Sequence, residues 1–394
     1  MAHPRKIAPV VRELAKQYPA LTVTGPRQSG KTTLCRALFP DYGYVNLEPL
    51  DQREFAREDP RGLLAEHPDG LILDEIQNVP EVLGYIQEVV DRDASPGRFI
   101  LTGSQHFALA DSVSQSLAGR TSILQLLPLS LEEYDDFGIP LDNLFQTLFA
   151  GGYPRIHDRN IAPRRWLADY VATYIERDVR QIANVSDLGT FSNFLRLCAA
   201  HTAQEVNLSA LGADAGVSHN TARKWLSILE TSFVLMLAPA WHPNIKKQLV
   251  KRPKLHFLDA GLACHLLGIR NADELRHHPL RGAVFESWVA AEIYKHHTHR
   301  GQQAMLHHYR ESRGAEIDIV LQSGNRLIAC EAKSGATLHS SFLDHLRQYS
   351  DRTRSLFPRP EVDLRLVYGG DTRQRRLDVE CLGWRQIHEM EWGC

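Results

Sequence analysis

Nine consecutive residues near the start of the chain combine glycine, lysine and hydroxyl side chains at the spacing of a phosphate-binding loop. They are Gly25, Pro26, Arg27, Gln28, Ser29, Gly30, Lys31, Thr32 and Thr33, and they match the pattern G-x-x-x-x-G-K-[ST]. The glycines let backbone amides turn toward phosphate oxygens, while Lys31 supplies positive charge to the β- and γ-phosphates. The Thr32 hydroxyl can ligate Mg²⁺. The segment therefore predicts a nucleotide site built from these residues.

Two carboxylates follow a later apolar segment. Asp74 and Glu75 end residues 71–75, and Asp74 lies 43 residues after Lys31. In P-loop ATPases an acidic residue here holds Mg²⁺ and a second one orients and activates the attacking water, so we assign these roles to Asp74 and Glu75. A kinase would not need Glu75, and the pair therefore favours ATP hydrolysis.

A second constellation lies near the C-terminus. Residues 315–321 and 326–333 read as strands that flank a turn at 322–325. If Leu321 pairs with Arg326, Asp318 faces Ala329, and alternation along the strands puts Asp318, Glu331 and Lys333 on one face. Glu286 approaches from a predicted amphipathic helix at 284–294. A solvated hairpin face with ion pairs is the simpler interpretation.

This arrangement resembles the restriction-endonuclease-like fold, whose motif is an acid followed by acid-x-Lys on the next strand. The resemblance implies that Glu286, Asp318 and Glu331 ligate Mg²⁺. It also implies that Lys333 positions or activates the hydrolytic water. A domain that only binds its target is the alternative.

The first part of the chain must position the nucleotide site. Apolar segments at 21–24, 44–47, 71–75, 98–102 and 122–127 alternate with helical stretches such as 33–39. Such strands, separated by helices, predict an α/β fold with a parallel sheet covered on both faces.

The middle of the chain has a helix-turn-helix pattern. A helix from about Ser209 is expected to stop at Gly216, and a second begins after Ser218 as N-cap. One face of the second helix is apolar, with Ala222, Trp225, Leu226 and Leu229. The other presents His219, Asn220, Arg223, Lys224 and Ser227. Residues 244–254 carry five basic residues and no acid, and are predicted to form a phosphate-contacting wing. Winged helices also serve as lids and subunit docks.

Length and charge indicate several domains. The 394 residues are too many for one ordinary core. Residues 1–150 carry 13 Lys and Arg against 21 Asp and Glu, whereas residues 151–300 carry 19 against 13, so the middle is suited to an anionic partner. We expect an ATPase domain at 1–150, a helical winged-helix region at 151–270 and a restriction-endonuclease-like α/β domain at 271–394.

The six cysteines are scattered, and no apolar run approaches the length of a membrane helix. No apolar signal core follows the first six residues, so we expect no secretion signal. We therefore expect a cytoplasmic protein without a membrane partner.

Several segments together resemble a prokaryotic AAA-family ATPase, and the resemblance covers nearly the whole chain. They are residues 24–34, 73–77, 101–104, 117–120, 127–130, 151–154 and 174–179. The resemblance implies binding of ATP with Mg²⁺, hydrolysis and possible ring assembly, with Arg120 or Arg177 as an arginine finger. In ATPases with an additional strand, a polar residue after that strand touches the γ-phosphate and the water. Ser104 is our choice, with Thr102 and Gln105 as rivals.

The sequence thus predicts an AAA-type ATPase whose nucleotide state is coupled to a DNA-interacting C-terminal half. Two alternatives stay open. One is an ATP-gated, Mg²⁺-dependent nuclease of a defence or toxin–antitoxin system. The other is an ATP-binding regulator that does no chemistry on DNA.

Overall fold

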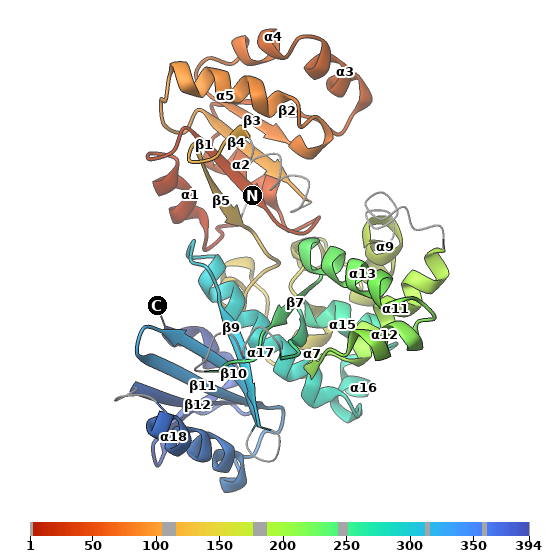
Figure 1. Cartoon of the computed structure of the whole chain (residues 1–394), viewed down its shortest axis with the longest axis vertical. Coiled ribbons are helices and arrows are strands. Elements are labelled where there is room, and N and C mark those ends of the chain that lie inside the picture. The colour runs from red at the N-terminus through yellow and green to blue at the C-terminus, as the bar shows by residue number, and fades with distance from the viewer. Residues whose placement is uncertain are drawn as a thin grey trace.

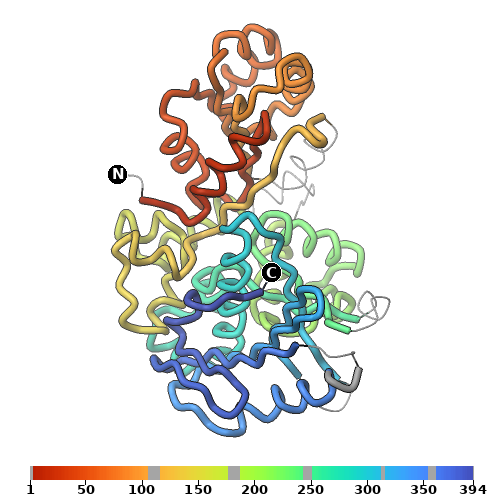
Figure 2. Tube along the Cα trace, turned by 90° about the vertical axis from the view of Figure 1, so that its left-hand side faces the viewer, coloured from red at the N-terminus to blue at the C-terminus, as the bar shows by residue number. Residues whose placement is uncertain are grey.

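A computed structural model describes residues 3–104, 116–175, 187–242, 251–311, 316–356 and 361–393. A parallel sheet with its helices occupies one end of the long axis, and a mixed sheet formed by the C-terminal residues occupies the other (Figure 1). A view turned by 90° shows the same separation of the two ends (Figure 2). Among the described residues, no helix combines the length and the apolar character needed to cross a membrane.

The N-terminal sheet has five parallel strands in the order β2-β3-β4-β1-β5. The strands are β1 (Ala20–Thr24), β2 (Gly43–Asn46), β3 (Leu71–Asp74), β4 (Phe99–Gly103) and β5 (Thr121–Gln125). All five agree with the predicted segments to within about two residues. Because β4 lies between β1 and β3, the ends of three neighbouring strands meet at one edge of the sheet, where the phosphate-binding loop begins.

Both faces of this sheet are covered, as the apolar strands predict. Leu21 and Val23 of β1 pack with α1 (Ala8–Leu14) and α2 (Lys31–Leu38) on one face. Leu71 and Leu73 of β3 point to the other face, because side chains alternate along a strand. That face is covered by α3 (Leu50–Glu58), α4 (Pro60–Ala65) and α5 (Val82–Arg92). The parallel α/β architecture is thus confirmed.

The middle of the chain is mostly helical. Its helices are α7 (Leu144–Ala150), α8 (Pro154–Asp158), α9 (Pro163–Tyr170), the π-helix η4 (Val171–Ile175), α11 (Leu188–Ala200), α12 (Leu208–Asp214), α13 (His219–Thr231), α15 (Ala260–Leu266) and α16 (Ala272–His277). A three-stranded antiparallel sheet in the order β6-β8-β7 joins β6 (Gln204–Glu205), β7 (Leu235–Ala238) and β8 (Lys254–Phe257).

The two helices predicted at 209–230 are present. Ser218 is the N-cap of α13, and its side chain accepts a hydrogen bond from the Thr221 amide at 3.1 Å. The four predicted apolar positions of α13 are buried, while Arg223 and Lys224 are exposed. Of the predicted wing, residues 244–250 lie outside the described residues.

The C-terminal region follows the long helix α17 (Arg281–Thr298). Its six-stranded sheet has the order β13-β14-β12-β11-β10-β9. The elements are β9 (Leu306–Arg310), β10 (Glu316–Ser323), β11 (Arg326–Lys333), α18 (Asp344–Leu356), β12 (Glu361–Tyr368), β13 (Gln374–Arg376) and β14 (Val379–Gly383). Pairing is antiparallel from β9 to β11 and parallel between β11, β12 and β14. Short 3₁₀ segments complete the chain: η1 (Ile76–Asn78), η2 (Leu131–Glu133), η3 (Asp135–Phe137), η5 (Ser340–Leu343) and η6 (Trp384–Glu389).

The predicted register of the β10–β11 hairpin is wrong by two residues. Arg326 pairs with Ser323 rather than Leu321, and Ala329 pairs with Val320 rather than Asp318. The difference arises because the turn is tighter than expected: Gly324, at φ 57°, and Asn325 connect the strands. A shift of two preserves the face of each side chain where a strand alternates regularly. The pairing of β10 is irregular between Ile317 and Val320, so Asp318 is placed by its contacts, and it lies 3.9 Å from Lys333.

The helix α17 connects the two ends of the molecule. Its Glu292 accepts a hydrogen bond from the Leu131 amide at 2.7 Å, and Lys295 donates to the Leu129 carbonyl at 3.0 Å. Apolar side chains from residues 127–149 share one buried cluster with α17 and the C-terminal sheet. The division at residue 150 stays a prediction, although this packing joins residues 127–149 to the C-terminal core.

A buried ionic group lies where α17 ends. Glu133 is fully buried; it accepts hydrogen bonds from the Arg5 guanidinium, the shortest at 2.8 Å, and lies 3.6 Å from the His299 imidazole. Burial opposes the ionised form of Glu133, but Arg5 and His299 outweigh it and lower its pKa to about 2. Burial also lowers the pKa of His299 to about 4, although Glu133 opposes the shift.

We predict that His299 makes the folded state sensitive to mild acid. Between about pH 6.5 and pH 4 the unfolded chain binds a proton at this histidine and the folded chain does not, so stability falls as the pH falls through that window. At about 1.4 kcal/mol per pH unit, the loss reaches roughly 3 kcal/mol. Urea unfolding at several pH values should show a shallower pH dependence for His299→Gln. His219→Gln, at an exposed position, is the matched control and should follow the wild type.

Candidate functional site

The phosphate-binding loop has the backbone conformations its sequence requires. Gly25 has φ 148°, and a Cβ placed there would meet the Leu126 carbonyl oxygen at 2.1 Å. Gly30 has φ 96° and immediately precedes α2. Only glycine meets both demands without strain. The loop therefore places the N-terminus of α2, with its free amides, where a phosphate binds.

Lys31 points back into this loop. Its ammonium donates to the carbonyl oxygens of Gly25 at 3.0 Å and Pro26 at 2.9 Å. The residue is 5% exposed, and burial lowers its pKa despite the nearby Asp74 and Glu75. A buried ammonium held only by neutral carbonyls is well prepared for an anionic ligand. Ser29 adds a second signal, since its buried hydroxyl has no hydrogen-bond partner among the described residues.

Arg5 binds the backbone of the phosphate-binding loop, a role that sequence reasoning missed. Its guanidinium donates to the Ser29 carbonyl at 2.7 Å and to the Leu127 carbonyl at 2.8 Å, besides binding Glu133. Nothing in the local sequence around Arg5 signals this role, because its partners lie 24 to 128 residues away.

The predicted Mg²⁺ ligands lie together. The Thr32 hydroxyl donates to Asp74 Oδ2 at 2.8 Å, and the Tyr44 hydroxyl donates to the same oxygen at 2.9 Å. Thr102 binds the other carboxylate oxygen. Among the described residues, the side chains that donate hydrogen bonds to the Asp74 carboxylate are hydroxyls, although the Lys31 ammonium lies near enough to interact with its charge. A hydroxyl and a carboxylate at this spacing fit a magnesium ion.

Glu75 is held in a strained conformation directly after β3. Its backbone has φ 56° and ψ 44°, which is left-handed and costs a non-glycine residue about 1 kcal/mol or more. Its carboxylate accepts from the Ser104 hydroxyl at 3.1 Å and from the Gln77 amide. Ser104, the preferred choice, therefore lies beside Glu75, whereas Thr102 binds Asp74. The rival Gln105 lies outside the described residues.

The segment that follows α7 contributes to the wall of the cavity at the phosphate-binding loop. A cavity of about 700 Å³ is lined by the loop and by Arg155, Arg159 and Tyr174. The Gln28 amide donates to the Tyr174 hydroxyl at 3.1 Å, and Arg155 donates to Gln28 at 3.4 Å. No local sequence pattern predicts these contacts. They join the phosphate-binding loop to α8 and η4.

The two arginine-finger candidates stay undecided. Arg120 makes a two-pronged ion pair with Asp91, with contacts of 2.6 and 3.0 Å. Arg177 lies outside the described residues.

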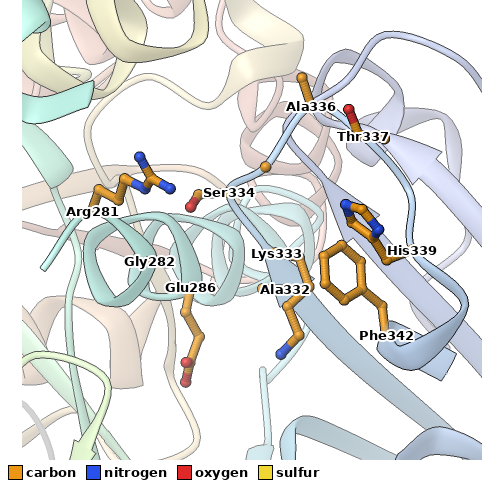
Figure 3. Close-up of a pocket in the computed structure, with 11 residues that line it drawn as sticks. Arg281, Gly282, Glu286, Ala332, Lys333, Ser334, Ala336, Thr337, His339 and Phe342 are labelled. Carbon is orange, nitrogen blue, oxygen red and sulfur yellow. The ribbon is translucent and has the colours of Figure 1, made fainter. Parts of the chain in front are cut away.

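The four predicted C-terminal residues also converge. Lys333 lies 2.6 Å from Glu331 and 3.9 Å from Asp318. Glu286 extends from α17 along the same pocket, opposite Lys333 (Figure 3). That pocket has a volume of about 540 Å³. Burial, and then the Asp318 carboxylate, raise the pKa of Glu286 to about 8 and that of Glu331 well above its ordinary value.

A fifth residue, Lys254, was predicted as part of the phosphate-contacting wing at 244–254, and that prediction is wrong for this lysine because its side chain is buried among carboxylates. Its ammonium lies 2.8 Å from Glu286, 3.0 Å from Glu316 and 3.6 Å from Asp318. Burial lowers the pKa of Lys254, but the three carboxylates raise it by more. Among the described residues, no three His, Cys, Asp or Glu side chains are arranged to hold a metal ion. As it stands, this cluster does not fit Mg²⁺, and the ligand roles of Glu286, Asp318 and Glu331 stay predictions.

Comparison with known protein families agrees with the N-terminal site. Residues 17–135 match the model of a family described as an AAA domain. Residues 141–273 and 281–387 match two families each described as a domain of unknown function. The first match, with the parallel sheet and the loop, supports an AAA-type ATPase region that binds ATP.

Two relatives from curated collections are similar to most of the chain. The uncharacterized protein Rv2008c of Mycobacterium tuberculosis is 28% identical over 341 residues, which cover 84% of this chain and 74% of the relative. An uncharacterized protein of Haemophilus influenzae is 23% identical over 283 residues, which cover 64% of this chain and 70% of the relative.

Among solved structures, the Walker-type ATPase PABY2304 of Pyrococcus abyssi is 16% identical, with 68% of this chain and 96% of that chain covered and a TM-score of 0.45. DnaA from Aquifex aeolicus, with bound AMPPCP, is 16% identical. The match covers 57% of this chain and 85% of that chain, with a TM-score of 0.30.

The geometry of Gly25 gives a test of the loop. We predict that Gly25→Ala lowers the thermal midpoint and abolishes binding of a fluorescent ATP analogue, because its Cβ would collide with the Leu126 carbonyl. Gly84→Ala is the control: this glycine lies inside α5 with open space around it, so the change should stabilise the helix by up to about 1 kcal/mol and leave binding intact. Wild-type affinity in Gly25→Ala would contradict the assignment.

Proposed function

We propose that this chain is an AAA-type ATPase that binds ATP with Mg²⁺ in the cytoplasm and hydrolyses it. One observation carries the proposal: Lys31, the Thr32–Asp74 pair and the Glu75–Ser104 pair lie together at one edge of the parallel sheet. Those groups are the ones that phosphoryl transfer to water requires.

Each residue has a physical role in this reaction. Lys31 exchanges its carbonyl partners for phosphate oxygens, and the loop amides bind the same anion. Thr32 and Asp74 would hold Mg²⁺, which would neutralise phosphate charge. Glu75 orients the attacking water and accepts its proton, with Ser104 fixing the carboxylate.

The nucleotide is well placed to influence the rest of the chain. Arg155 and Arg159 reach the pocket from α8, so they respond to the number of phosphates present. Arg5 links the loop carbonyl at Ser29 to Glu133, and Glu133 contacts His299 after the end of α17. Nucleotide state is thereby coupled to the C-terminal half. A ring would add an arginine finger from a neighbour, with Arg177 or Arg120 as the donor; Arg120 would first have to leave Asp91.

The partner of the C-terminal half is proposed to be DNA. The order α11, β6, α12, α13, β7, β8, with an antiparallel sheet joining the three strands, supports a winged helix. On α13, His219, Asn220, Arg223 and Lys224 are exposed and point away from the core. The basic residues before β8 would contact phosphates as the wing.

Two substitutions test the ATPase. We predict that Lys31→Ala abolishes ATP binding or slows turnover by roughly 10²- to 10³-fold, because one preorganised charge is lost. Glu75→Gln should keep ATP binding and slow hydrolysis by about 10²- to 10⁴-fold. Phosphate release and equilibrium binding measure the two effects separately. Wild-type turnover in Lys31→Ala would refute the assignment, and Gly84→Ala is again the control.

A second function is favoured by a separate observation. The order α17, β9, β10, β11, α18, β12 brings Asp318 and the Glu331–Lys333 pair together, and Lys333 lines one pocket with the helix carboxylate Glu286. That arrangement supports an ATP-gated nuclease, in which Lys333 would position the attacking water. A regulator that binds ATP and performs no chemistry on DNA is the remaining alternative.

The nuclease proposal predicts metal-dependent cleavage. Purified protein with ATP and Mn²⁺ should cut single- or double-stranded DNA or RNA, and Lys333→Ala should reduce cutting by about 10²-fold or more. ATP hydrolysis should be unchanged, because Lys333 ends β11, and that strand belongs to the C-terminal sheet at the opposite end of the molecule from the N-terminal sheet (Figure 1). Absence of any cleavage would remove the nuclease proposal, and absence of salt-sensitive DNA binding would then favour the regulator.

A further inference from the structure

A lysine from the middle of the chain lies inside the C-terminal carboxylate cluster. Lys254 is the first residue of β8, whereas its partners Glu286 and Asp318 come from α17 and β10. Its ammonium contacts three carboxylates at 2.8 to 3.6 Å, and its side chain is 2% exposed. Carboxylate oxygens from separate elements that converge on one point form the kind of site that binds a divalent cation. In this structure the Lys254 ammonium occupies the position where the carboxylates converge.

One carboxylate of the cluster, that of Glu331, has an oxygen that a further ligand could contact. Glu331 is 2% exposed; its Oε2 accepts from Lys333 at 2.6 Å. Its Oε1 is buried and has no hydrogen-bond partner within the part of the chain that the structure describes. A buried carboxylate oxygen without a partner is costly in a native fold. This oxygen therefore indicates a position that another conformation or a ligand satisfies.

We propose that Lys254 is a tethered counter-ion that occupies the cation position of this cluster, so that a divalent metal ion binds among Glu286, Asp318 and Glu331 only when β8 withdraws. The inference rests on the nuclease function proposed above, since it concerns the regulation of that same site. It explains why the carboxylates converge and yet do not form a metal site in this conformation.

The location of Lys254 shows what would release it. The strand β8 is the central strand of the β6-β8-β7 sheet, and its neighbour β7 contacts α13. Lys251 and Arg252, which lie just before β8, are exposed. A nucleic acid bound to this basic segment would therefore act directly on the strand that carries Lys254. Target binding would thus open the cluster to its metal.

The experiment is a titration of full-length, nucleotide-free protein with Mn²⁺ alone, followed by the electron paramagnetic resonance signal of free Mn²⁺. Lys254→Met removes the charge and keeps most of the stem. It should bind Mn²⁺ at least about tenfold more tightly than the wild type, because Glu286 and Asp318, two of the three proposed ligands, lose their cation. Adding Asp318→Asn to Lys254→Met should abolish the gain. Lys251→Met, at an exposed lysine three residues earlier, should behave as the wild type.

Equal Mn²⁺ affinity in Lys254→Met and the wild type would overturn the proposal, as would an equal gain in Lys251→Met. Should Lys254→Met not fold, the wild type decides the question: tight Mn²⁺ binding that Asp318→Asn removes would overturn the proposal, and its absence supports it. Failure of the proposed nuclease function can be distinguished from failure of the counter-ion proposal. A Lys254→Met protein that binds Mn²⁺ and cuts nothing supports the counter-ion and removes the nuclease.

Discussion

The ion pair between Arg5 and Glu133 is the interaction on which the relation between the two halves depends. Both side chains are almost completely buried, and a buried charge that loses its partner is strongly destabilising. Through this pair the N-terminal segment supports the phosphate-binding loop at Ser29 and contacts His299 beyond α17. Separating the loop from Glu133 would leave buried charges without partners, and Glu292 and Lys295 of α17 bind the same segment at Leu131 and Leu129. A change at the nucleotide site has a direct physical route to the helix that carries Glu286.

Two groups of acids in this chain differ in the kind of partner that stabilises their carboxylates. Asp74 accepts hydrogen bonds from the hydroxyls of Thr32, Tyr44 and Thr102, which are uncharged. The C-terminal acids are instead bound by the ammonium groups of Lys254 and Lys333. The first arrangement leaves a charge for a cation to meet, whereas the second is already partly neutralised. Residue types alone do not distinguish the two cases, because both are acids at strand ends or on strand faces.

Much of the fold could be predicted because its signals are local. The five strands of the first sheet were found from short apolar segments, and the N-cap of α13 from Ser218, since capping involves residues only three apart. The hairpin register was wrong by two because the turn length depends on the conformation of Gly324. The faces of Glu331 and Lys333 are unaffected by that error, since alternation along a strand has a period of two, and Asp318 lies 3.9 Å from Lys333.

The sequence by itself determined the phosphate-binding loop and the acids after β3, because glycine flexibility, lysine charge and strand polarity act within a few residues of chain. Only the tertiary structure decided the partners of those groups. Arg5 reaches Glu133 across 128 residues of sequence, and Lys254 reaches Glu286 across 32. Neither contact has a local pattern, because a buried charge is satisfied by whichever opposite charge the packing of distant elements brings near. The packing of distant elements thus determined which groups surround each set of acids. The side-chain partners of Asp74 are hydroxyls, whereas the C-terminal acids are paired with the ammonium groups of Lys254 and Lys333.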